Sequence, residues 1–96
     1  MASNGFLDGS FEKAMTNLLH ESGVVGVSST DQNGLCVSAK GSANASASGY
    51  IRSLANRARE LAPSDSEKPT ICIETESTNI FIRDEDNLTV AVYRIP

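Results

Sequence analysis

The order in which helical and strand-like patterns follow one another constrains this chain more than any single motif. A helical apolar stripe comes first, followed by two strand-like runs joined by Asn33-Gly34, a second helical stripe and three more strand-like runs. The 96 residues permit one domain, which would bury roughly two-thirds of the surface of its unfolded chain. A five-stranded sheet has two faces and two edges, and two helices cover little of that surface. The order therefore predicts an α+β domain that completes its packing by association.

The first helical stripe is expected to begin at Ser10, a residue type that caps helices by accepting a hydrogen bond from an orphan backbone N–H. Gly23 is expected to end it, because glycine adopts the left-handed conformation without strain. Residues 1–9 show no period and are expected to form a flexible leader before a domain spanning 10–96. The stripe repeats at helical spacing and consists of Phe11, Ala14, Met15, Leu18 and Leu19.

A hairpin is predicted next. Residues 24–30 are rich in valine, which favours a strand, and residues 35–39 form the expected return strand. Between them Asn33-Gly34 tolerates positive φ and indicates a tight turn. A loop over 40–44 then leads to a second helix over about 45–62, which Pro63 ends. The apolar stripe of that helix contains Ala47, Tyr50, Ile51, Leu54, Ala58 and Leu61.

Three strands complete the chain after a polar linker over 64–69. The first, over 70–76, alternates, so that Ile71 and Ile73 face one way and Cys72 and Glu74 the other. The other two are predicted over 80–83 and 88–95.

This order resembles the roadblock/LC7 family over about residues 11–94. The residues that carry the resemblance are Val24-Val25-Gly26-Val27, Thr30-Asp31, Asn33-Gly34-Leu35, Gly41, Ile71-Cys72-Ile73-Glu74, Asn79-Ile80 and Leu88-Thr89-Val90-Ala91-Val92. The resemblance implies a profilin-like, five-stranded antiparallel sheet in the order 2-1-5-4-3. It also implies one helix on each face and no closing third helix.

Within that family the chain is most similar to the roadblock-type subunits of the Ragulator (late endosomal/lysosomal adaptor) complex. The resemblance implies a non-catalytic scaffold without a cofactor, cytoplasmic and held on the cytosolic face of the lysosome. The implied partners are the fourth roadblock subunit, a membrane-anchored wrapping subunit and, within the complex, the Rag GTPases that signal amino acids to the mechanistic target of rapamycin complex 1. The alternative is a homodimeric roadblock adaptor associated with dynein or regulating a small GTPase.

Family members join their third strands edge to edge, so residues 70–74 are the first candidate for partner binding. The middle of this strand has no charge, proline or bulge to protect it, which makes it a template for another strand. Ile73 is expected to offer a backbone donor to the partner. The competing interpretation is an edge covered by the linker. The candidate residues are Thr70, Ile71, Cys72, Ile73 and Glu74.

One flank of the second helix is the second candidate. Ser48 and Ala55 are small enough to allow close helix approach, and Arg52 and Arg59 can extend around such a contact. The competing interpretation is a solvated face, and the sequence leaves open which flank meets the partner. On the opposite side of the sheet, the short first helix is expected to leave apolar surface bare around Val25, Val27 or their strand neighbours.

Other classes of function are disfavoured. With 8 basic and 12 acidic residues the net charge is −4, unlike a nucleic-acid binder, and no apolar run approaches a membrane span. His20 has no nameable catalytic partner, and Cys36 and Cys72 lack zinc-site spacing, so two reduced, buried thiols are expected. The acidic turn at 84–86 lacks the spacing of a calcium loop. No catalytic, cofactor or metal site is expected, which disfavours a ligand-holding sensor or enzyme domain.

Overall fold

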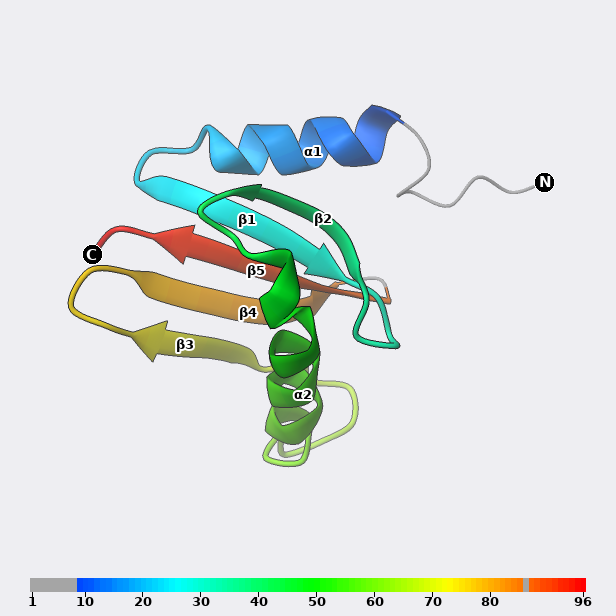
Figure 1. Ribbon diagram of the computed structural model, residues 1–96. Helices are drawn as coiled ribbons and strands as arrows, with labels where there is room; N and C mark the ends of the chain where they lie inside the picture. The colour runs from blue at the N-terminus through cyan, green and yellow to red at the C-terminus, as the bar shows by residue number, and fades with distance from the viewer. Residues whose placement is uncertain (1–8, 86) are drawn as a thin grey trace.

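The structure is a computed structural model that describes residues 9–85 and 87–96, and it contains one antiparallel sheet between two helices (Figure 1). The sheet order is β2-β1-β5-β4-β3, as predicted. In chain order the elements are α1 (Gly9–Leu19), β1 (Val24–Thr30), β2 (Cys36–Gly41), the 3-10 helix η2 (Ala45–Ala47), α2 (Ser48–Arg59), β3 (Thr70–Glu74), β4 (Asn79–Glu85) and β5 (Leu88–Arg94). The predicted α+β class is confirmed.

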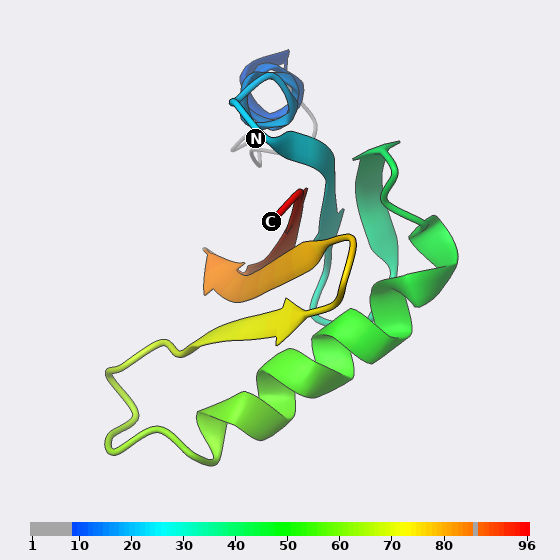
Figure 2. The ribbon, with the colours of Figure 1, turned by 90° about the vertical axis from the view of Figure 1, so that its left-hand side faces the viewer.

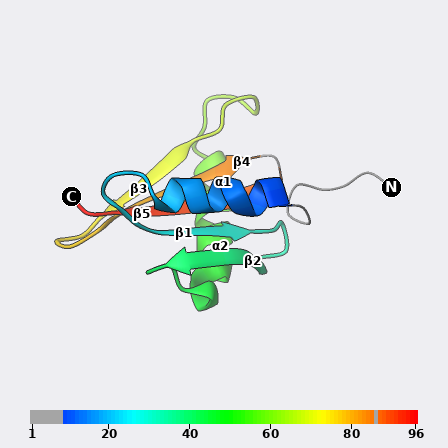
Figure 3. The same ribbon diagram turned by 90° about the horizontal axis from the view of Figure 1, so that it is seen from above.

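The two helices lie on opposite faces of the sheet (Figure 2). Seen from above, α1 runs along the strands, whereas α2 crosses beneath them (Figure 3). α1 packs mainly on β1 and β2 and therefore covers only one side of its face. Met15 and Val27 are buried there, and Ser29 Oγ donates to Met15 Sδ at 3.1 Å. An ion pair of 2.9 Å between Lys40 Nζ and Glu12 Oε1 also joins β2 to α1.

The other face carries the second part of the core. Ile51 and Ala55 of α2 pack against Ile82 and Ala91 of the sheet. Because side chains alternate along a strand, residues on either side of Ile82 and Ala91 point toward the α1 face.

The β1–β2 hairpin forms at the predicted place. The Asp31 carboxylate holds the turn, because its Oδ1 accepts hydrogen bonds from the backbone N–H groups of Asn33 and Leu35, both at 2.9 Å. Only Gly34 in this turn has positive φ, at 87°. With Gly34 N donating to Asp31 O, this is a type I turn closed by a left-handed glycine.

Element ends differ from the sequence expectation for local reasons. The first turn of the second helix is 3-10, with Asn44 Oδ1 accepting from Ser46 N at 2.9 Å, and α2 ends at Arg59. β3 ends at Glu74, because Thr75 N donates to Thr78 O at 2.9 Å and closes a turn. β2 extends to Gly41, and β4 runs from Asn79 to Glu85. Gly9 belongs to α1, whereas the rest of the expected leader, 1–8, lies outside the described residues.

The expectation of two buried thiols is wrong for Cys72. Its side chain is exposed on β3, and Cys36 is half-buried. An apolar strand sequence does not guarantee burial when the strand lies at the edge of the sheet and α1 covers the far side of that face.

Candidate partner-binding surface

β3 is an edge strand that pairs with β4 alone. The predicted alternation is confirmed: Ile71 and Ile73 are half-buried on the α2 face, and Cys72 and Glu74 are exposed. Thr70, which begins the strand, is also exposed. The strand therefore presents one apolar face to α2 and leaves its outer backbone unpaired among the described residues.

The turn after β3 decides which backbone groups point outward. Thr75 N donates to Thr78 O, which makes that pair hydrogen-bonded, and such pairs recur at every second residue of an antiparallel ladder. In the observed register the next hydrogen-bonded pairs are Ile73 with Ile80 and Ile71 with Ile82. The outward backbone donor is therefore that of Cys72, and the expectation that Ile73 offers it is wrong. We call the outward groups of Thr70, Cys72 and Glu74 the free edge.

The linker does not pair with this edge. Its backbone bond from Glu67 N to Ser64 O is internal, and no backbone bond between 64–69 and β3 is present in the described chain. α2 extends beyond β3, and the linker returns from its end to the start of the strand (Figures 1 and 2). A groove of about 350 Å³ lies there. Its apolar lining is Ala58, Leu61, Ala62, Pro63, Pro69 and Ile71.

The side of α2 that was expected to meet a partner is mostly turned toward the sheet. Ser48 and Ala55 are each 3% exposed and face the sheet, so their placement beside the core stripe is wrong. Tyr50, Leu54 and Leu61, assigned to the core stripe from sequence, are 77%, 39% and 87% exposed. The small side chains let the sheet approach one narrow side of the helix and leave the larger apolar residues outside. We call Tyr50, Leu54 and Leu61 the apolar flank.

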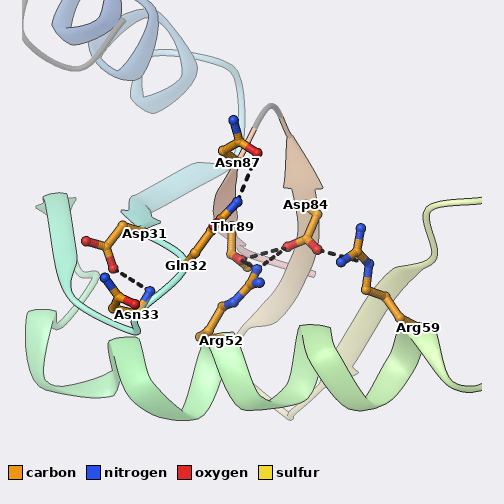
Figure 4. A network of polar contacts seen from close by, with 8 residues as sticks. All are labelled: Asp31, Gln32, Asn33, Arg52, Arg59, Asp84, Asn87 and Thr89. Carbon is orange, nitrogen blue, oxygen red and sulfur yellow. Dashed lines mark hydrogen bonds and ion pairs between the residues drawn. The ribbon is translucent and has the colours of Figure 1, made fainter. Parts of the chain in front are cut away.

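The opposite flank of α2 is joined to the sheet by a polar network around Asp84 (Figure 4). Asp84 Oδ1 accepts from Arg52 Nη1 at 3.1 Å and from Thr89 Oγ1 at 2.7 Å, and Asp84 Oδ2 lies 3.5 Å from Arg59 Nε. Arg52 Nη1 also donates to Thr89 Oγ1 at 2.9 Å. The side chains of Arg52 and Asp84 are 15% and 14% exposed. Arg52 therefore serves the fold, whereas Arg59 stays half exposed.

The sheet continues the apolar surface beside the apolar flank. Ile73, Ile80 and Tyr93 are half-buried residues that pack against the core under α2. Burial raises the pKa of the Tyr93 phenol above its ordinary value, so it is neutral at physiological pH. A partner would meet an uncharged surface here.

On the α1 face, the residues that the structure describes leave part of the sheet uncovered, as expected. Phe81, Val90 and Val92 are only half-buried, and a shallow hollow beside α1 is lined by Leu18, Glu21, Phe81, Val92 and Arg94. Val27 is completely buried, so it is not among the bare residues, and Val25 is half-buried. The uncovered residues are instead Phe81 of β4 and Val90 and Val92 of β5.

Residues with catalytic chemistry do not converge within the described ranges. No group of three or more His, Cys, Asp or Glu side chains could hold a metal ion in residues 9–85 and 87–96. His20 is exposed at the end of α1. In the same ranges, no helix has the length and apolar content needed to cross a bilayer.

Comparison with known proteins agrees with this geometry. The model of the family described as Ragulator complex protein LAMTOR5 matches residues 7–94. A LAMTOR5 homolog of the Ragulator complex from Nematostella vectensis is 39% identical over 85 residues, covering 88% of this chain and 93% of the relative. A second, from Dictyostelium discoideum, is 36% identical over 90 residues, covering 94% and 100%.

Among solved structures, a roadblock/LC7 domain from Streptomyces avermitilis superposes with a TM-score of 0.71 at 18% identity. The match covers 84% of this chain and 74% of that one. Such identity shows the fold alone, and the predicted roadblock/LC7 fold is confirmed. Because the family match extends over nearly all the described residues, the chain belongs to the Ragulator complex protein LAMTOR5 family and has the roadblock/LC7 fold.

Proposed function

We propose that this chain is a non-catalytic scaffold subunit of a Ragulator complex on the cytosolic face of the lysosome. It pairs with the fourth roadblock subunit and supports Rag GTPases in amino-acid signalling to the mechanistic target of rapamycin complex 1. Family membership supports the complex. The observation that carries the pairing is a free edge on β3 that lies beside the overhanging end of α2.

The pairing uses strand addition together with apolar burial. A partner strand would take the outward N–H and C=O groups of the free edge, while its apolar side chains would contact the part of α2 that extends beyond β3. The apolar flank would pack against the second helix of the partner. A standard interface buries about 800 Å² of each partner. To reach that area, both the free edge and the apolar flank have to take part in the contact.

Charge favours a different subunit over a second copy. Each chain carries a net charge of −4, so two copies would repel, and Glu74 lies at the free edge itself. The homodimeric adaptor is the second candidate, because a free edge can also accept the same strand from another copy.

The bare part of the α1 face supports a second contact within the complex. Phe81, Val90 and Val92 offer an apolar strip on β4 and β5 beside α1. We assign this strip to an extended or helical segment of the membrane-anchored wrapping subunit, which would hold the chain at the lysosome without insertion into the bilayer.

Hydrogen exchange should separate the two contacts. When the fourth roadblock subunit is added to the chain, we expect slower exchange at Cys72 and Glu74 and little change at Val90 and Val92. Ile71 and Ile73 serve as internal controls, because the register directs their N–H groups to β4. Adding the wrapping subunit should then slow exchange in β5. If the first addition leaves 70–74 unchanged, the proposed pairing is wrong, and if the second leaves β5 unchanged, the assignment of the bare strip is wrong.

A further inference from the structure

A polar cleft lies on the Arg52 side of α2, away from the apolar flank. Its volume is about 390 Å³, and parts of the chain that are distant in sequence form its walls. The lining residues are Gln32, Arg52, Arg59, Lys68, Asp84 and Asn87. The cleft lies on the side of α2 opposite Tyr50 and Leu54, so pairing there and at the free edge leaves its Arg52 and Arg59 side uncovered, whereas Lys68 also borders the groove beyond β3.

The cleft carries more positive charge than it neutralises. Among the described lining residues, Arg52, Arg59 and Lys68 stand against one carboxylate, that of Asp84, in a molecule whose net charge is −4. Both oxygens of Asp84 already accept contacts from this network. Within the described chain Lys68 forms no ion pair, and the Arg59 contact with Asp84 is a long one, 3.5 Å from Nε to Oδ2.

The side chains of the cleft also carry more hydrogen-bond donors than the network around Asp84 uses. Among residues 9–85 and 87–96, the buried Arg52 Nε has no hydrogen-bond partner, so the guanidinium has more donor capacity than Asp84 and Thr89 accept. The two nitrogen atoms at the end of the half-exposed Arg59 and the Lys68 ammonium can both reach solvent. Gln32 Nε2 donates to Asn87 Oδ1 at 2.9 Å and joins the two turns that form the far wall (Figure 4).

We propose that this cleft binds a carboxylate side chain of an acidic protein segment, in addition to the pairing described above. Arg59 would supply a forked pair of donors to the carboxylate, a geometry that guanidinium groups favour. Lys68 would supply the second positive charge. Arg52, Arg59 and Asp84 lie outside the proposed pairing surface, so their side of the cleft does not depend on the identity of the β3 partner, whereas Lys68 borders both surfaces.

A membrane surface fits the cleft less well than a peptide does. Anionic bilayers attract clusters of basic residues near the surface, whereas these three cations line a recess in an acidic protein. The proposed ligand is therefore an acidic peptide, and anionic vesicles are included in the experiment below as a comparison.

The test is a nuclear magnetic resonance titration of the whole chain with a capped pentaglutamate peptide. We expect shifts of the side-chain amide signals of Gln32 and Asn87, which line the cleft. Arg59→Gln and Lys68→Gln should each weaken binding about fivefold, as expected for a half-exposed charge pair. Arg57→Gln is the matched control, because it removes the same charge from the same helix outside the cleft. All three residues are exposed, so these variants should fold.

Competition by inorganic phosphate, with the same variant dependence, would show that the cleft recognises an oxyanion and would support the proposal. Equal weakening by Arg57→Gln and Arg59→Gln would overturn it in favour of diffuse attraction. The absence of peptide binding would also overturn it. So would binding to vesicles of phosphatidylserine and phosphatidylcholine that depends on Arg59 while the peptide does not bind.

Discussion

Replacing Cys72 with proline is expected to weaken association with the roadblock partner at least about tenfold while the isolated chain remains folded. The register directs the Cys72 N–H away from β4 to the free edge. Proline removes that donor and places its ring where the partner strand would lie, yet it is tolerated on an edge strand whose N–H faces outward. The measurement is the affinity for the fourth roadblock subunit, by calorimetry, together with a thermal unfolding curve of the chain alone.

Ile73→Pro is the matched variant, because it places the same residue one position along the strand. There the lost donor belongs to the β3–β4 ladder, so the main effect should be on folding, about 1–3 kcal/mol for the acceptor left unpaired. Cys72→Ser keeps the backbone donor and should bind as the unsubstituted chain does. Unchanged affinity for Cys72→Pro, with normal unfolding, would contradict the proposed edge.

Asp84→Ala is expected to lower the free energy of unfolding by about 3 kcal/mol, since it leaves the largely buried Arg52 without its carboxylate. Thr89, which is completely buried, also loses the acceptor of its hydroxyl proton. For a domain of this size the midpoint of thermal unfolding should fall by about 10–20 °C. The change should be visible by circular dichroism.

Two controls identify the cause. Glu85→Ala removes an exposed carboxylate one residue away, whose partner Arg83 is also exposed, and should cost less than about 1 kcal/mol. The double variant Arg52→Met with Asp84→Leu removes both charges together and should recover much of the loss, because no unpaired charge is left buried. Equal effects of Asp84→Ala and Glu85→Ala would show that the network does not stabilise α2 on the sheet.

Local sequence patterns were sufficient to predict the elements and their order. The valine-rich run of β1, the Asn33-Gly34 turn and the alternation of β3 each depend on neighbouring residues, and the structure has them where predicted. The strand order itself came from the resemblance to a known family. Element ends were less certain, because they depend on single bonds such as that from Asn44 to Ser46.

The α2 surface could not be predicted from periodicity. A stripe drawn by hydrophobicity places Tyr50, Leu54 and Leu61 inside, whereas the sheet touches the side that bears Ser48 and Ala55. The cause is tertiary, because Asp84 lies 32 residues from Arg52 and holds that side of the helix to the sheet. The outward direction of the Cys72 backbone N–H could not be predicted for a related reason. It depends on the turn at Thr75 and Thr78 rather than on the sequence of the strand.

The most direct test of the central claim is native mass spectrometry of the chain alone and after co-expression with the fourth roadblock subunit of the Ragulator complex. We expect a monomer for the chain alone and a one-to-one heterodimer after co-expression. We also expect Cys72→Pro to lower the yield of the heterodimer. A stable homodimer that persists in the presence of the fourth subunit, with no mixed species, would contradict heterodimeric pairing and favour the homodimeric adaptor.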